Sequence, residues 1–217
     1  MRGLPTWSKR RFAAQWRERG ELDGDICYVA LGDSAAQGIG ATSFEAGYVG
    51  GLAKLGEAHT GLTIRVVNLS VSGAKAADLI AHQLPLLAQL EADVVTCAVG
   101  GNDIRRFDPA AFEREMGQVV RSVPPHALVA DVPCFYDGRA EQRSKVASEI
   151  VQRLADAAGR TAIPLHRSTE ARTRAQVRGD FAADFFHPND RGYGVWTAAF
   201  EAAFLARLDV VVETRRA

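Results

Sequence analysis

Short β-favouring runs alternate with longer segments of helical periodicity along this chain of 217 residues, and this alternation restricts its fold more than any other feature. Five of the runs are apolar and rich in β-branched residues, as is typical of strands buried inside a parallel sheet. They lie at about residues 26–32, 63–69, 93–99, 127–132 and 161–166. Helices are predicted at about residues 44–59, 76–90, 109–122, 140–158 and 194–208, with Pro85 ending or kinking the second of them. The alternation predicts an α/β fold.

The architecture that this pattern favours is a three-layer α/β/α sandwich with a flavodoxin-like, five-stranded parallel sheet. Right-handed crossovers place helices on both faces of such a sheet, and we predict the strand order 2-1-3-4-5. Open α/β sheets bind their ligands at the carboxyl ends of the strands. The loops that follow the first three strands contain Ser34, Gly73 and Asn102. We therefore expect these three residues to converge on one site.

Ser34 is a candidate nucleophile, provided that a base can reach its hydroxyl. The segment Asp184-Phe185-Phe186-His187 offers that base, because residues three apart let the carboxylate lie beside the imidazole and hold its Nδ1–H. The Nε2 atom of His187 then faces Ser34. Acyl transfer also needs donors for the developing oxyanion. The backbone N–H groups of Ser34 and Gly73 and the side-chain amide of Asn102 are the candidates, since Gly73 lets its backbone approach a ligand closely.

Four sequence blocks in a fixed order resemble those of the SGNH (GDSL-type) esterase/lipase family. Together they span residues 26–207, and three of them lie at predicted strand ends. The blocks are Gly32-Asp33-Ser34, Gly73 within Asn68-Leu69-Ser70-Val71-Ser72-Gly73, Gly101-Asn102-Asp103, and Asp184-Phe185-Phe186-His187-Pro188-Asn189. The chain departs from the family pattern at Ala35, where the family name implies leucine. This departure bears on the substrate class more than on activity.

The resemblance implies a three-layer α/β/α fold and metal-free ester hydrolysis through an acyl-serine, with no cofactor. It assigns Ser34 as nucleophile, His187 as base and Asp184 as the acid that orients the base. It assigns the oxyanion hole to Ser34, Gly73 and Asn102. The Gly-x-Ser-x-Gly elbow of α/β-hydrolases is absent at Ser34, which argues against that fold.

Structural roles remain open for each of these residues taken alone. Ser34 could cap the helix that follows the first strand, since serine is a favoured N-cap. Gly73 and Asn102 could be turn residues, and His187 could simply begin a helix. Asp33 lacks the second and third ligands, at a sensible spacing, that a metal site would need. The other four histidines are assigned to surface or core without a role.

The sequence leaves more than one function open. The leading hypothesis is a serine hydrolase that cleaves small acyl esters. A carbohydrate O-acetylesterase or a thioesterase of the same fold is an alternative. A non-catalytic flavodoxin-like module could instead bind an anion on the same loops. The Asp184–His187 pair distinguishes these hypotheses, because an anion cradle does not need it.

The composition of the chain indicates which binding partners to expect. The formal net charge is zero, so no overall field attracts nucleic acid or a membrane surface. No apolar run is long enough for an integral membrane segment. Three widely spaced cysteines (Cys27, Cys97 and Cys134) form no disulfide framework and no metal signature, which suits the cytoplasm. A small-molecule ester is the expected partner, and the sequence does not indicate an oligomeric state.

Two further predictions concern the termini and the pocket. Residues 1–217 are predicted to form one domain, with residues 1–22 a basic N-terminal helix packed on it or flanking it. The apolar side of that helix carries Trp7, Phe12, Ala13 and Trp16. Short acyl groups are expected to be preferred, because the loops nearest the site, residues 133–139 and 167–183, are mostly polar.

Overall fold

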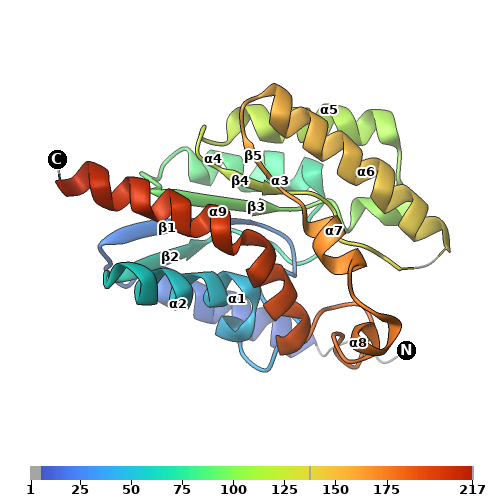
Figure 1. Ribbon diagram of the computed structural model, residues 1–217, viewed down its shortest axis with the longest axis horizontal. Helices are drawn as coiled ribbons and strands as arrows, with labels where there is room; N and C mark the ends of the chain where they lie inside the picture. Colours follow the sequence, from blue (N-terminus) through green and yellow to red (C-terminus); the bar gives the residue numbers. More distant parts are fainter. Residues whose placement is uncertain (1–5, 137, 217) are drawn as a thin grey trace.

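The computed structural model describes residues 6–136 and 138–216 and contains a five-stranded parallel sheet at its centre (Figure 1). The strand order is β2-β1-β3-β4-β5, which confirms the predicted order 2-1-3-4-5. In the centre of the sheet, Tyr28 pairs with Val66 on one side and with Val94 on the other. The strands are β1 (Ile26–Gly32), β2 (Ile64–Asn68), β3 (Val94–Ala98), β4 (Leu128–Ala130) and β5 (Thr161–Ile163). Their carboxyl ends share one edge because all pairings are parallel.

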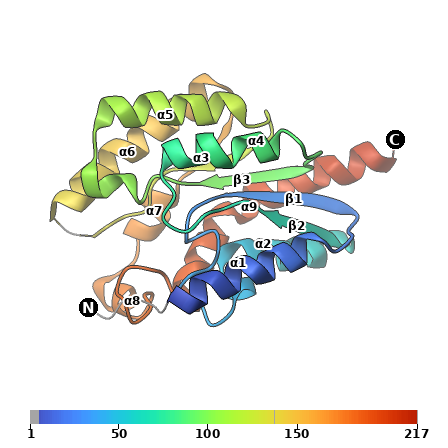
Figure 2. The same ribbon diagram turned by 180° about the vertical axis from the view of Figure 1, so that it is seen from behind.

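Helices cover both faces of the sheet, and each face has its own apolar core (Figures 1 and 2). On one face α1 (Thr6–Gly20), α2 (Tyr48–Thr60) and α9 (Asp190–Arg216) bury an aromatic cluster, in which the rings of Tyr48 and Phe200 stack 5.4 Å apart. On the other face lie α3 (Ala76–His82), α4 (Leu84–Leu87), α5 (Pro109–Ser122) and α6 (Gly138–Ala157). The predicted three-layer α/β/α sandwich is therefore confirmed.

Two of the predicted helices are interrupted. The helix expected at residues 76–90 divides into α3 and α4 at Gln83, because Pro85 lacks an N–H and its ring would clash with a preceding carbonyl. The helix expected at residues 44–59 begins as a 3-10 turn, η1 (Phe44–Ala46), and restarts as α2 after the extended Gly47. The last helix, α9, extends beyond the predicted residues 194–208 at both ends.

The segment after β5 is more regular than the sequence suggested. The strand stops at Ile163, and Pro164, which has no N–H for the ladder, precedes α7 (Leu165–Glu170). A second short helix, α8 (Arg174–Arg178), begins with a capping box between Thr173 and Gln176. Neither helix was predicted. Both lie at the edge of the sheet where the strands end (Figure 1), so they bear directly on the site.

The predicted N-terminal helix is present as α1, which packs beside β2 and η1 (Figure 2). Phe12 and Trp16 are buried, whereas Arg10, Arg11 and Arg17 are exposed. Residues 1–5 of the predicted span, and the side chain of Trp7, lie outside the described residues. The organisation of residues 1–217 as one domain stays a prediction. Among the helices of the described residues, none combines the length and the apolar character needed to cross a bilayer.

Candidate active site

The end of β1 holds Ser34 in a tightly constrained position. A side chain on Gly32 would clash with the backbone oxygen of Ala98, and Gly32 has a φ of +149°, so only glycine fits there. The amide of Gln83 accepts from the N–H of Gly32 at 2.9 Å and donates to its carbonyl at 2.7 Å. The Ser34 side chain that follows is buried, with 5% of its surface exposed. The strand end therefore presents this hydroxyl on a rigid support.

His187 lies within hydrogen-bond distance of both Asp184 and Ser34, although 153 positions separate it from Ser34. The His187 Nε2 atom lies 3.0 Å from the Ser34 Oγ atom, and the His187 Nδ1 atom lies 2.6 Å from Asp184 Oδ2. Both His187 and Asp184 are buried. The structure thus brings together the three residues that the sequence predicted as a catalytic triad.

A tight turn between α8 and α9 orients the acid and the base. The Asp184 Oδ1 atom accepts from the backbone N–H groups of Phe186 and His187 at 3.1 and 3.0 Å, while Phe185, next to Asp184, takes a φ of +54°. Burial opposes ionisation of Asp184, but the hydrogen bonds from His187 and from this turn outweigh it, so its pKa lies below the ordinary value. An ionised Asp184 can only accept, so His187 carries its proton on Nδ1. The unprotonated Nε2 atom then accepts from the hydroxyl of Ser34.

The three candidate oxyanion donors have different surroundings. The Asn102 amide nitrogen donates to Asp33 Oδ2 at 2.9 Å and to the carbonyl of Ala74 at 3.0 Å, so both of its hydrogens already have acceptors. Gly73 lies on an exposed loop with a φ of +88°, and the space around its Cα is open. The sequence prediction included Asn102 but gave no partner for its amide.

Asp33 is the residue near the site whose part the sequence analysis missed. It is buried beside Ser34, and its Oδ1 atom accepts from the N–H of Ala35 at 2.9 Å while Oδ2 holds Asn102. Burial raises the pKa of Asp33 to about 7, and burial likewise raises the pKa of nearby Asp103 to about 6. The part of Asp33 could have been inferred from the tripeptide Gly32-Asp33-Ser34, in which an acidic residue follows a buried strand.

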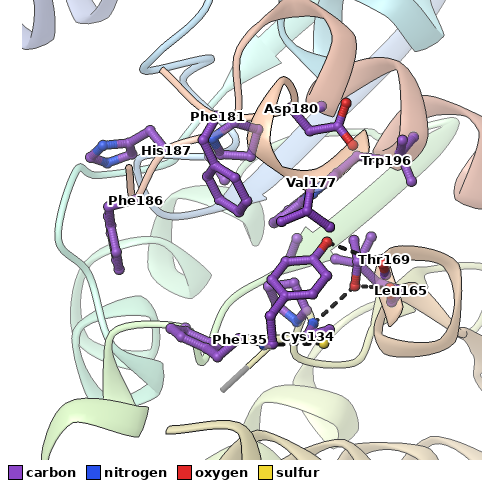
Figure 3. Close-up of a pocket in the computed structure, with 18 of the residues that line it drawn as sticks. Cys134, Phe135, Leu165, Thr169, Val177, Asp180, Phe181, Phe186, His187 and Trp196 are labelled. Atoms are coloured by element: carbon purple, nitrogen blue, oxygen red, sulfur yellow. Dashed lines mark hydrogen bonds between the residues drawn. The ribbon is translucent and has the colours of Figure 1, made fainter. Parts of the chain in front are cut away.

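A cavity of about 360 Å³ opens beside Ser34 and His187 and extends beneath α7, α8 and the loop after β4 (Figure 3). Its lining is mainly apolar, although its walls come from the two loops that were expected to surround the site with polar groups. Four apolar side chains of these loops, Phe135, Tyr136, Val177 and Phe181, line the cavity beside the polar Thr169, Arg172, Arg178 and Asp180. These four apolar side chains were visible in the sequence, but their direction was not. The preference for short acyl groups stays a prediction.

One group of possible metal ligands comes together within the described part of the chain: Cys134, Glu141 and His166. Each is already engaged. Glu141 lies 3.0 Å from His166 Nε2 and accepts from the N–H groups of Phe135 and Tyr136 at 2.7 and 3.2 Å. Burial and the hydrogen bond to Glu141 raise the pKa of the Cys134 thiol to about 12, and a protonated thiol is a poor ligand. The cluster therefore supports the loop after β4, and His166, which was assigned no role, is part of that support.

The sequence and the fold both resemble those of known proteins. The family model of the GDSL-like Lipase/Acylhydrolase family matches residues 30–195. The lipase/acylhydrolase from Enterococcus faecalis is 20% identical over 84% of this chain and 96% of its own, with a TM-score of 0.69. An acetylxylan esterase from Geobacillus stearothermophilus is 19% identical over 85% of this chain and 96% of its own, with a TM-score of 0.68. A lipase from a goat rumen metagenome is 19% identical over 84% of this chain and 99% of its own, with a TM-score of 0.66.

No curated protein sequence matches this chain. At the identities of the three solved structures, the likeness shows the fold alone. The family match covers most of the chain and includes Ser34, Gly73, Asn102, Asp184 and His187.

Proposed function

This chain belongs to the GDSL-like lipase/acylhydrolase family, and we propose that it is a serine hydrolase that cleaves carboxylic esters through an acyl-serine intermediate. The observation that carries the proposal is the chain of short distances from Asp184 through His187 to Ser34, at 2.6 and 3.0 Å. A nucleophile, a base and a residue that orients the base are the arrangement that such chemistry requires.

The reaction begins with attack of Ser34 Oγ on the ester carbonyl carbon. The His187 Nε2 atom takes the hydroxyl proton as the new C–O bond forms, and ionised Asp184 stabilises the imidazolium through its Nδ1–H. The carbonyl π electrons move to the oxygen, which becomes an oxyanion. The C–O bond to the alcohol then breaks, and His187 returns its proton to the leaving alkoxide. Water repeats the sequence on the acyl-serine and releases the acid.

The backbone N–H groups of Ser34 and Gly73 and the Asn102 amide serve as donors to the oxyanion. Gly73 suits this role because the space at its Cα is open to a substrate. Asn102 would exchange one of its two acceptors, Asp33 or Ala74, for the oxyanion. Pairing in the resting state holds the amide in place before the reaction, which is the preorganisation that electrostatic catalysis uses.

Oxygen esters, thioesters and sugar O-acetyl esters would all pass through the same acyl-serine. A non-catalytic anion-binding module is the alternative of another class. It would leave the Asp184–His187 pair without a use, since neither an acid nor a base is needed to hold an anion on backbone amides. The triad geometry therefore favours the hydrolase.

A serine-reactive fluorophosphonate probe tests this proposal, because rapid labelling requires an activated serine. We expect one adduct, located on Ser34 by mass spectrometry of a digest. Ser34→Ala should abolish both labelling and hydrolysis of p-nitrophenyl esters. Ser122→Ala, at an exposed serine of α5, serves as the matched control and should leave both unchanged. An adduct on a different serine, or full hydrolysis by Ser34→Ala, would refute the proposed nucleophile.

A further inference from the structure

The cavity beside Ser34 has the chemistry of a hydrocarbon-binding chamber. Its walls include Val99 after β3, Phe135 after β4, Leu165 of α7, Val177 of α8, Phe181 between α8 and α9, and Trp196 of α9. In Figure 3 the Val177 and Phe181 side chains lie between His187 on one side and Leu165 and Thr169 on the other. The chamber therefore runs from the reacting serine into the interior between α7 and α8.

Two polar side chains of this wall, Thr169 and Tyr136, are bonded within the protein and not available to a ligand, whereas Arg178, also in the wall, is exposed. The Thr169 hydroxyl donates to the carbonyls of Leu165 and His166 and accepts from the N–H of Cys134 at 2.9 Å. The Tyr136 hydroxyl donates to the carbonyl of Thr169 at 3.0 Å. A sugar hydroxyl placed against these two side chains would lose its bonds to water without replacement, because desolvated hydroxyls need partners. An alkyl chain has no such requirement.

Asp180 lies in the same wall, and it too is paired with residues of the chain. Its carboxylate binds Arg172 at 2.9 Å and Arg191 at 2.6 Å. Burial raises the pKa of this carboxyl, but the two arginines outweigh it and hold the pKa below the ordinary value. The carboxylate is thus neutralised within the protein and anchors α8 to α9. The paired Asp180 carboxylate therefore forms part of the chamber wall without needing a positively charged ligand group.

The chamber wall is also held in shape by a strained residue. Tyr136 has a φ of +65°, a conformation that is costly for a side chain of this size. Three contacts hold it: Glu141 accepts from its N–H at 3.2 Å, its hydroxyl binds Thr169, and its ring meets that of Phe181 edge-on at 6.0 Å. Such strain persists only where the surroundings over-determine it, and it concentrates at functional sites. A wall held in this way limits how long a chain the cavity can hold.

We propose that this chamber takes the acyl chain of the substrate, so that medium-chain fatty acyl esters or thioesters, with acyl groups of about eight to ten carbons, are preferred. The proposal rests on the proposed function, since the acyl carbonyl must sit at Ser34. A cavity of about 360 Å³ holds roughly twelve groups of about 30 Å³, the share of one water in the liquid. Part of that space is the mouth and the carbonyl end, which leaves room for a chain of the stated length.

A series of p-nitrophenyl esters from acetyl to hexadecanoyl tests the length. Each methylene that leaves water for the chamber should raise kcat/KM by about fourfold. The rise should end near octanoyl or decanoyl, where the chain reaches the far wall. A matched series of alkyl acetates, which lengthens the alcohol and not the acid, should show no comparable rise. An optimum at acetyl, or a rise confined to the alcohol series, would overturn the assignment of the chamber to the acyl chain.

Filling the chamber provides the second arm of the test. Val177→Phe should lower the ratio of kcat/KM for the decanoyl ester to that for the acetyl ester by at least tenfold. Val210→Phe, at a half-exposed position of α9 outside the chamber (49% exposed), makes the same change and should leave the ratio unaltered. Thermal melts establish that both variants are folded. An unchanged ratio in Val177→Phe would refute the proposal.

The Ser34→Ala variant distinguishes a failure of the proposed serine mechanism from a failure of the proposed role of the chamber. If that variant still hydrolyses the p-nitrophenyl esters, the proposed function itself is wrong. If it is inactive while the wild type prefers acetyl esters, the serine mechanism stands and only the role of the chamber is rejected.

Discussion

The Asn102 side chain is held in place by a buried carboxyl group, that of Asp33. Its amide is aimed by Asp33 and by the carbonyl of Ala74, both within 3.0 Å. Among the described residues, Asn102 is the one side chain that donates a hydrogen bond to the Asp33 carboxyl, and burial raises the pKa of Asp33 to about 7. At neutral pH the Asp33 carboxyl therefore exists in both protonation states. The pairing positions Asn102 without committing a permanently charged group to the interior.

Replacement of Asn102 by alanine should lower kcat by about 10²–10³, the usual loss for one oxyanion donor. KM should change little, because the donor acts mainly in the transition state. Loss of its partner leaves Asp33 unpaired, but Asp33 can protonate near neutral pH, so the fold should survive. Steady-state kinetics with thermal melts measure both effects. A folded Asn102→Ala variant with wild-type kcat would show that Asn102 is only a turn residue.

At the scale of elements, α1 supports two loops of the site. The Trp16 indole donates to the carbonyl of Gln37, in the loop after Ser34, at 3.1 Å. The Gln37 side chain in turn donates to the carbonyl of Ser70, in the loop that leads to Gly73, at 2.9 Å. The Trp16 ring also meets Phe44 edge-on at 4.7 Å. The family match begins only at residue 30, so this support precedes the matched region.

Trp16→Ala should therefore destabilise the protein by about 3–5 kcal/mol, the usual cost of removing a buried tryptophan from a core. Arg17→Ala, at the adjacent exposed position of the same helix, serves as the control and should change stability by about 0.5 kcal/mol or less. Urea denaturation followed by circular dichroism measures both. If the two variants unfold at the same urea concentration, α1 does not contribute to the core in the way that the structure indicates.

Across the whole molecule, the buried carboxyl groups divide into two classes with opposite effects on stability. Burial raises the pKa of Asp33 to about 7 and that of Asp103 to about 6, from an ordinary value of 3.8, and it also raises the pKa of Asp131. For Asp180 and Asp184 burial is outweighed by hydrogen bonds and charges, and the pKa of each is lowered. The first class contributes stability that is lost as pH rises through about 6 to 7. The second contributes stability that is lost as pH falls below the ordinary value.

The free energy of unfolding should therefore be highest near pH ~4, just above the ordinary value of 3.8, and decline until about pH 7, where Asp33 has also ionised. Between these values the native state keeps protons on Asp33 and Asp103 that the unfolded chain has released, which is the sign that makes stability fall with rising pH. Asp103→Asn, which keeps an acceptor for the N–H of Ala76, should show a smaller decline. Urea denaturation across this range measures both proteins. Equal declines would exclude Asp103 as a source of the pH dependence.

The class of fold and the strand order were predictable from the sequence, and so was the proximity of Ser34, His187 and Asp184. The strands of the sheet are local apolar runs, and the handedness of crossovers leaves few ways to connect them. The spacing of Asp184 and His187 is local too, and the loop positions of Ser34, Gly73 and Asn102 follow from the strand order. Residues in these patterns could be placed without knowing their distant neighbours. Their catalytic roles stay a prediction that the experiments above address.

The tertiary structure alone decided the character of the pocket and the pairing of Asn102. Asp33 and Asn102 are separated by 69 positions, and Glu141 and His166 by 25, so no local pattern links them. The direction of Phe135, Val177 and Phe181 depends on how α7, α8 and the loop after β4 pack against one another. Composition marks those loops as polar because it counts side chains without regard to direction. Which side chains surround Ser34 is settled by packing between segments far apart in the chain.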